Sequence, residues 1–242
     1  MLTLIAALKE ELAGLKQRMT VEDTVAENGY QIFHSRQGGK ETLLVQTGTG
    51  RERAERAVRF VLEHYPARAI ISFGFAGGLT PELSVGEIIL CSTLCCNDGP
   101  SDSCRPDADL FSRSLQICDG SITHQGKSVT VARPAPQPEV KRALAQAFQA
   151  DVVDMESYWI ARIANEKGVP FLAVRAVSDT VQERLPPVER MLGSNGEPDL
   201  RKIVFYSLFH PRQLVTLTRL HRNSRIAREN LTTFLSQLME RF

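Results

Sequence analysis

The sequence predicts an α/β fold with a largely parallel or mixed sheet, because short apolar runs alternate along it with helical patterns. The clearest run is 170–177, whose apolar and partly β-branched residues are typical of a strand buried on both faces. It ends at Ser178 and Asp179, and a second run, 151–153, leads into Asp154-Met155-Glu156. Because ligands bind beyond strand ends in such sheets, these carboxylates predict one shared cleft.

The length and charge of the chain limit the classes of protein it can belong to. Its 242 residues suit one sizeable domain, with an α/β unit at 1–198 and a helical tail at 199–242 that belongs to it. The formal net charge of +1 provides no field to attract nucleic acid. No apolar run is long enough to span a membrane, and the apolar start predicts a first strand rather than a signal peptide.

The cysteines indicate a reducing compartment. Their odd number, without the spacing of a small disulfide scaffold, predicts reduced thiols and a cytoplasmic protein. The cluster between residues 91 and 104 lacks the paired spacing and the nearby histidine of a zinc site, so we expect neither a metal nor a cofactor. The cysteines are Cys91, Cys95, Cys96, Cys104 and Cys118.

In the N-terminal third, apolar runs predict strands, and apolar residues three and four positions apart predict helices. Gly38-Gly39 separates two of the strands and predicts a hairpin. In chain order we expect a strand at 2–7, a helix from Lys9, strands at 30–34 and 42–46, a helix over 54–62 and a strand at 69–73.

The same alternation continues to residue 180. Gly168 and Pro170 end a helix, and the Asp-, Ser-, Pro- and Gly-rich stretch 97–109 predicts a loop. We expect strands at 85–90, 128–132, 151–153 and 170–177, with helices at 140–148 and after Glu156. Residues 181–198 predict an irregular flap, and residues from 199 onward predict helix interrupted at Pro211.

Two glycine-rich stretches follow predicted strands. Gly48 to Gly50 precede a helix whose free N–H groups could accept an anion, and Arg51 could support that anion or face solvent. Residues 74–78 hold three glycines, which predicts either a tight turn or a close approach of the backbone to a ligand. Gly48 and Gly77 are therefore candidate substrate contacts.

The residue types in the predicted cleft permit cleavage of a nucleoside. A carboxylate accepts two hydrogen bonds from adjacent hydroxyls, so Glu156 suits a sugar diol. Asp179 could protonate a leaving purine if burial raises its pKa. The ribosyl cation left behind would then need water or phosphate as its nucleophile.

Four motifs in order carry a family resemblance over residues 1 to about 180. They are Phe73-Gly74-Phe75-Ala76-Gly77-Gly78-Leu79, Val85-Gly86-Glu87-Ile88, Val153-Asp154-Met155-Glu156-Ser157 and Val174-Arg175-Ala176-Val177-Ser178-Asp179. The chain resembles the purine nucleoside phosphorylase and nucleosidase superfamily, and within it the methylthioadenosine/S-adenosylhomocysteine nucleosidase branch. The resemblance implies a three-layer α/β/α fold with a central mixed, partly barrel-like sheet, and a homodimer.

The resemblance also implies roles for the matching residues. Glu156 would hold the ribose 2′- and 3′-hydroxyls, and Met155 would pack beneath the ribose. Asp179, oriented by Ser178, would protonate purine N7. Glu11, in the matching segment 5–11, would orient or deprotonate the attacking water.

The chain departs from the family pattern in three places. Phe75 stands where the nucleosidases usually carry a serine that helps to hold the water, and Asp154 replaces a glutamate, which shortens its reach toward the ribose. The segment 131–135 replaces a more polar stretch beside the base. The purine is therefore held differently, or the substrate differs.

We expect hydrolysis of a purine nucleoside, with adenine or a related base and a 5′ modification. Phosphorolysis needs several cationic or N–H donors that converge on phosphate, and only Arg51 and Gly48 to Gly50 are candidates. A nucleoside-binding regulatory protein is the alternative from another class. The presence of Glu11, Glu156 and Asp179 together argues against it.

The tail 199–242 holds eight Lys or Arg and three acidic residues beside an apolar stripe. A helix with such a stripe packs on its own domain or a partner subunit, or it rests on an anionic membrane surface. The membrane alternative would suit a lipid-linked nucleoside, as in the hopanoid-associated (adenosylhopane-type) members of the superfamily. The stripe consists of Leu217, Leu220, Ala227, Leu231, Phe234 and Leu238.

Overall fold

A computed structural model describes residues 1–27, 29–117, 122–186, 193 and 214–241. Within these ranges the strands form one nine-stranded sheet in the order β2-β3-β4-β1-β5-β8-β7-β6-β9. The strands are β1 (Leu2–Ala6), β2 (Thr20–Glu27), β3 (Tyr30–Gln37), β4 (Lys40–Gln46), β5 (Ala69–Gly78), β6 (Ile88–Cys96), β7 (Thr123–Thr130), β8 (Val152–Asp154) and β9 (Phe171–Asp179).

The sheet is mixed, and part of it closes on itself. β5 is parallel to both β1 and β9 and antiparallel to β8, while β6 is antiparallel to β9. The extra pairing of β5 with β9 closes β5, β8, β7, β6 and β9 into a ring. The expected mixed, partly barrel-like sheet is therefore confirmed.

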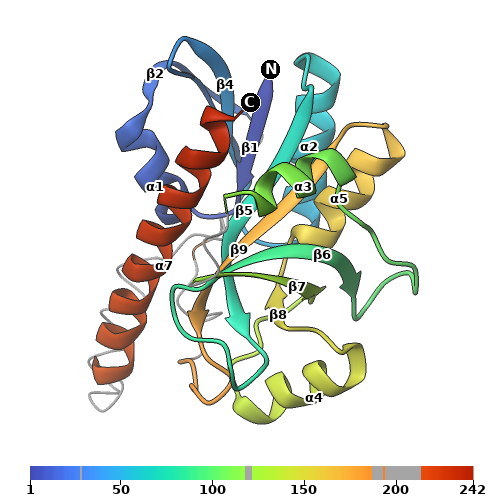
Figure 1. The fold of residues 1–242 in the computed structure, drawn as a ribbon, viewed down its shortest axis with the longest axis vertical. Helices are drawn as coiled ribbons and strands as arrows, with labels where there is room; N and C mark the ends of the chain where they lie inside the picture. The colour runs from blue at the N-terminus through green and yellow to red at the C-terminus, as the bar shows by residue number, and fades with distance from the viewer. Residues whose placement is uncertain (28, 118–121, 187–192, 194–213, 242) are drawn as a thin grey trace.

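Helices cover both faces of the sheet, as the expected three-layer fold requires (Figure 1). The apolar faces of α2 and α5 pack into one core cluster, and those of α1 and α7 into a second cluster on the other face. α4 packs into a smaller third cluster near β8. The described helices are α1 (Lys9–Arg18), α2 (Arg51–His64), α3 (Ala108–Leu115), α4 (Pro138–Phe148), α5 (Ser157–Glu166) and α7 (Leu214–Glu240).

Several predicted elements differ from the structure at their ends. The glycine-rich stretch after residue 73 does not turn, because β5 continues to Gly78 and pairs there with β8 and β9. β6 begins at Ile88 instead of residue 85 and extends to Cys96, so three of the cysteines are strand residues. Ser178 and Asp179 are the last residues of β9 instead of lying beyond it.

Two elements were absent from the prediction. β2 is an edge strand on which no residue is buried, so its sequence lacks the apolar alternation of a half-buried strand. α3 starts inside the predicted loop, where the Asp107 side chain accepts a hydrogen bond from the N–H of Leu110 and caps the helix. The hairpin at Gly38-Gly39 is confirmed, and both glycines have positive φ.

α7 lies along the sheet and contacts β9, β5 and α1 (Figure 1). Its residues Ala227, Leu231, Phe234 and Leu238 are buried in the core cluster that also holds the apolar face of α1. The tail prediction from 199 to 213, with its break at Pro211, lies outside the described residues, and so does most of the predicted flap. Within those ranges, no helix is long and apolar enough to cross a membrane.

Candidate active site

A cavity of about 300 Å³ lies where the ends of β5, β8 and β9 meet the start of α1. This volume is within the range of small-molecule sites. The predicted residues Glu11, Phe75, Gly77, Asp154, Met155, Glu156, Ser178 and Asp179 all line it. The shared cleft predicted from two strand ends is therefore present.

Glu11 lies in the first turn of α1 and is held by three backbone donors. Its Oε2 accepts the N–H groups of Ala7 (3.0 Å) and Leu8 (2.8 Å), and its Oε1 accepts that of Phe75 (2.7 Å). Burial raises the pKa of Glu11 to about 7, although these hydrogen bonds oppose the rise. A carboxyl that titrates near neutral pH suits a general base.

The first glycine of the β5 stretch provides the space for this carboxylate. A Cβ on Gly74 would lie 2.5 Å from Glu11 Oε1, closer than real Cβ atoms approach. A Cβ on Gly77 would lie 3.1 Å from Asp179 Oδ2. The glycines therefore allow the Glu11 and Asp179 side chains to approach the strand closely, whereas the predicted approach of this backbone to a ligand stays a prediction.

Glu156 occupies the N-cap position between β8 and α5. Its Oε1 accepts the N–H of Gly50 at 2.7 Å, which ties the carboxylate to the start of α2. Burial raises the pKa of Glu156 to about 8, and the negative charges of Asp154 and Glu11 add to this rise. Glu11 and Glu156 both line the cavity, so the two carboxyls share one site.

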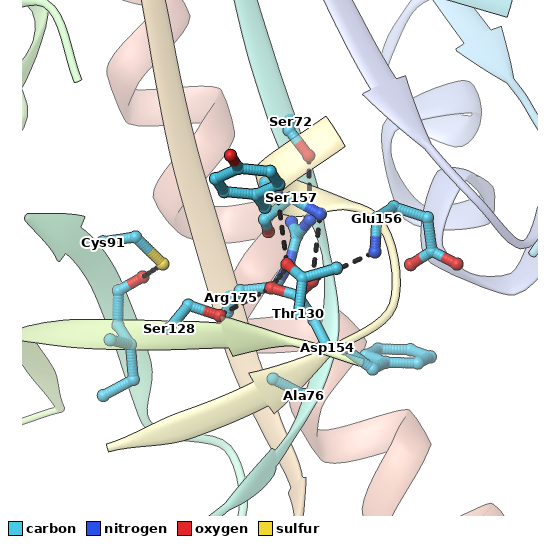
Figure 2. A network of polar contacts seen from close by, with 12 residues as sticks. Ser72, Ala76, Cys91, Ser128, Thr130, Asp154, Glu156, Ser157 and Arg175 are labelled. Atoms are coloured by element: carbon cyan, nitrogen blue, oxygen red, sulfur yellow. Dashed lines mark hydrogen bonds and ion pairs between the residues drawn. The ribbon is translucent and has the colours of Figure 1, made fainter. Parts of the chain in front are cut away.

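Asp154 has a structural role that its place in the motif did not indicate. Its carboxylate accepts hydrogen bonds from Ser128 (2.6 Å), Thr130 (2.8 Å) and the backbone N–H groups that follow it in the turn to α5 (Figure 2). Burial works to raise the pKa of Asp154, but the Arg175 guanidinium and the donors outweigh it and hold the pKa below its ordinary value. Asp154 therefore holds the turn that presents Glu156. It also lines the cavity, so its contact with a substrate stays a prediction.

Arg175 is a buried charge to which the sequence analysis gave no function. Its Nε lies 3.4 Å from Asp154 Oδ2, and its Nη2 donates to Ser72 at 2.8 Å (Figure 2). A cavity of about 10 Å³, about the space of one water molecule, is lined by Arg175, Glu11 and Glu156 among others. The single charge in an otherwise apolar strand was the signal for it.

Asp179 has two side-chain partners at the end of β9. Ser178 Oγ donates to its Oδ1 at 2.7 Å, in agreement with the orienting role predicted for Ser178. Lys141 Nζ on α4 lies 2.5 Å from its Oδ2, and both side chains are buried. Burial raises the pKa of Asp179, and the Lys141 ammonium opposes the rise.

Lys141 was not among the candidate site residues, because the helix predicted at 140–148 gave no reason to place a lysine inside. In the structure the apolar Val140 is 42% exposed, whereas Lys141 is fully buried. Lysine usually faces solvent, and its partner is far along the chain. The sequence contains no local signal for this contact.

Two predicted anion ligands do not line the cavity. The N–H of Gly48 donates to the carbonyl of Ala7 at 2.9 Å. The Arg51 guanidinium stacks on the Trp159 ring, 3.8 Å from its centroid, and pairs with Glu55 at 2.9 Å. Of the stretch 48–51, the residue that lines the cavity is Thr49. Arg51 thus has structural partners outside the cavity, and its role as an anion ligand stays a prediction.

The cysteines Cys91, Cys95, Cys96 and Cys104 are buried and form no disulfide, whereas Cys118 lies outside the described residues. Burial raises the pKa of the Cys91 thiol to about 12 and that of Cys104 to about 11. Such thiols are unreactive apolar fillers. In the described part of the chain, no three His, Cys, Asp or Glu side chains gather as a metal site would require.

Comparisons with known proteins identify the family of this chain and structures that share its fold. The family described as "Phosphorylase superfamily" matches residues 2–192. The 5′-methylthioadenosine/S-adenosylhomocysteine nucleosidase of Neisseria meningitidis, solved with methylthio-immucillin-A, is similar over 100% of this chain and 99% of its own, with 18% identity and a TM-score of 0.79. The futalosine hydrolase of Helicobacter pylori strain 26695 is similar over 100% and 97%, with 14% identity and a TM-score of 0.80. The Helicobacter pylori methylthioadenosine nucleosidase shows 15% identity over 100% and 98%, with a TM-score of 0.80.

Proposed function

This chain belongs to the phosphorylase superfamily and is an N-ribosyl hydrolase or a nucleoside phosphorylase; on that premise we propose that it is a hydrolase. Its substrate is a purine nucleoside, with adenine as the base and a modified 5′ position. This choice rests on the charge of the cavity and on the two cavity-lining carboxyls Glu11 and Glu156.

The charge of the cavity supports water over phosphate as the nucleophile. Glu10, Glu11, Asp154, Glu156 and Asp179 line it, and no Lys or Arg is among its described lining residues. Phosphate binds where cations and N–H donors converge, whereas these side chains are carboxyl groups that repel phosphate in their ionised form. Water is neutral, and the small cavity lined by Glu11, Glu156 and Arg175 has room for about one water molecule but not for phosphate.

Each of the three carboxyls has a different role in cleavage. Glu156 accepts hydrogen bonds from the ribose 2′- and 3′-hydroxyls, and Met155 packs beneath the sugar. Glu11 orients the water and takes its proton as the oxygen attacks the anomeric carbon. Asp179 delivers a proton to the base as the bond to the sugar breaks. Phe75, which replaces the expected serine, contributes its backbone N–H to Glu11.

The walls of the cavity suit a flat base and an uncharged 5′ group. Val131, Pro134, Ala135 and Leu185 form an apolar wall, which fits a purine held by packing and by Asp179. Leu8 together with Leu220 and Ser224 of α7 extends the cavity for the 5′ substituent. A methylthio-type group is compatible with these residues, whereas a 5′-phosphate is disfavoured by the surrounding carboxylates.

The packing of α7 argues against the lipid-linked alternative. The apolar stripe that suggested a membrane surface is buried from Ala227 to Leu238 against the sheet. We further propose a homodimer, from the family resemblance, and a cytoplasmic location, because the four described cysteines are unpaired. Light scattering on the purified protein tests the dimer, and the monomer mass would contradict it.

A panel of nucleosides, assayed with and without phosphate, tests the proposed function. We expect release of adenine from methylthioadenosine or a related 5′-modified adenosine at a rate that phosphate does not change. The sugar product should carry a free anomeric hydroxyl. Phosphate-dependent turnover with a sugar 1-phosphate as product would identify a phosphorylase instead, and binding without turnover would indicate the regulatory alternative.

A further inference from the structure

Lys141 is a buried charge whose position contradicts local preferences. It lies in the first turn of α4, just after Pro138, where the helix dipole disfavours a cation. Its side chain is also fully buried, which is costly for an ammonium group unless it is paired. A lysine held here against both preferences needs strong partners, and such sites are often functional.

The partners of Lys141 use all of its hydrogen-bonding capacity. Its Nζ donates to Asp179 Oδ2, to the carbonyl of Thr180 at 2.6 Å and to the carbonyl of Glu183 at 3.3 Å. An ammonium group has three N–H donors and no acceptor, so its donors match these three oxygen atoms in number. Asp179 is therefore one half of a buried ion pair, which we call the Lys141–Asp179 pair.

In an ion pair the transferable proton is on the Lys141 ammonium group and not on the Asp179 carboxylate. A carboxylate paired with an ammonium group has no proton of its own to give. We propose that Lys141 is the positioning residue that supplies, through Asp179, the proton that the departing base takes up. The inference rests on the proposed function and extends it to a residue that does not line the cavity.

The electron pair of the N-glycosidic bond goes to the base, the sugar gains a hydroxyl group from the attacking water, and the other proton of that water goes to Glu11. One proton passes from Lys141 Nζ to Asp179 Oδ2, and Asp179 gives a proton to the base nitrogen. Lys141 is left as a neutral amine and Glu11 as a carboxylic acid. Once the products leave, Glu11 releases its proton to solvent and Lys141 takes one up, so no proton is gained or lost over the cycle.

The pH dependence of a Lys141→Met variant separates this relay from a structural clamp. Without Lys141, only an Asp179 carboxyl that is itself protonated can donate. The ratio of wild-type to variant rate should then be small near about pH 5 and grow about tenfold per pH unit above the pKa of the lone carboxyl. A clamp that merely fixes α4 would give a ratio independent of pH.

A Lys141→Arg variant separates proton supply from charge. Arginine keeps the cation beside Asp179 but does not release a proton in proteins. The relay therefore predicts that Lys141→Arg stays far below wild type at every pH where Asp179 is ionised. Restoration of the wild-type rate by arginine would show that only the charge matters, and it would overturn the relay.

Other charged groups around the pair remain unchanged in these variants. They are Glu183 in the next turn, Arg219 of α7 at 3.3 Å from Glu183, the surface pair Glu139–Arg184 and, across the cavity, Glu11 and Glu156. Because each of them is present in both proteins, the rate ratio isolates the contribution of Lys141. Arg142→Met, on the exposed side of the same helix, is the matched control and should behave as wild type.

Controls for folding and for the leaving group complete the experiment. If Lys141→Met fails to fold, Lys141→Gln keeps an N–H donor for the two carbonyls and gives the same ratio test. On p-nitrophenyl riboside, whose leaving group needs no proton, the variants should match wild type at every pH. Wild type without nucleoside cleavage would refute the proposed function, whereas active wild type with a flat ratio would refute only the relay.

Discussion

Asp179 is held by Ser178 and Lys141 at the end of β9, and burial raises its pKa. Asparagine fills the same volume but cannot pass a proton to the base. Asp179→Asn should therefore fold normally and release purine at least ~100-fold more slowly, the usual loss for a general acid. Steady-state release of adenine measures this, and near wild-type turnover would remove Asp179 from the mechanism.

The buried Glu156 carboxylate lowers the stability of the protein without substrate, and this loss can be measured. Burial raises its folded pKa to about 8 from an ordinary value near 4.5, so the native state binds more protons than the unfolded state between these values. Stability from this group is present at low pH and is lost as pH rises through the folded pKa. Glu156→Gln should therefore raise the free energy of unfolding by about 1–4 kcal/mol near pH 9, with little difference below about pH 4.5.

Thermal denaturation across this pH range tests the stability of the Glu156→Gln variant. The same variant should lose its preference for a ribonucleoside over the 2′-deoxy analogue, because a charge-assisted contact to the diol is removed. A variant that is less stable than wild type at high pH would contradict the account of burial. Unchanged discrimination between the two nucleosides would contradict the diol role.

At the scale of the element, β5 is shaped to admit side chains from other elements. A Cβ on Gly74 would overlap Glu11 Oε1, whereas one on Gly78 would make ordinary contacts at 3.4 Å. Gly74→Ala should displace the Glu11 carboxylate and lower hydrolysis at least ~10-fold, and Gly78→Ala in the same strand should keep most activity. Equal activity in the two variants would show that the Glu11 position is not set by the strand.

The strands and helices around the site follow from local patterns, whereas the contacts between them do not. The apolar runs at 69–73 and 170–177 identified β5 and β9, because strands buried on both faces are apolar throughout. The polar edge strand β2 has no such pattern and was missed. The glycine stretch was ambiguous, because a turn and a close approach both require the absence of a side chain.

The site residues, too, divide into those that a local pattern identifies and those that only the folded structure reveals. Glu11, Glu156 and Asp179 were identified because they follow strands and match a family motif, and all three line one cavity. Lys141 escaped notice because its burial depends on a carboxylate 38 residues away, which no local period shows. Arg51 was a reasonable anion ligand by position, but its contact with Trp159 arises only in the folded protein.

At the scale of the whole molecule, α7 connects the C-terminal part of the chain to the site. Leu231 is buried between α7 and the sheet, while Ile226 on the same helix is 37% exposed. Leu231→Ala should lower the free energy of unfolding by about 2–5 kcal/mol, and Ile226→Ala by about 1 kcal/mol or less. Urea denaturation compares them, and equal losses would mean that α7 does not pack as the structure shows.

The central claim is that water attacks the sugar in a cavity of carboxylates. The most direct test is to let the protein cleave a 5′-modified adenosine in ¹⁸O-water that also contains phosphate, and to weigh the sugar by mass spectrometry. The account predicts one ¹⁸O atom on the anomeric carbon, adenine without label, and no sugar phosphate. A sugar 1-phosphate, with its anomeric oxygen drawn from phosphate, would contradict it.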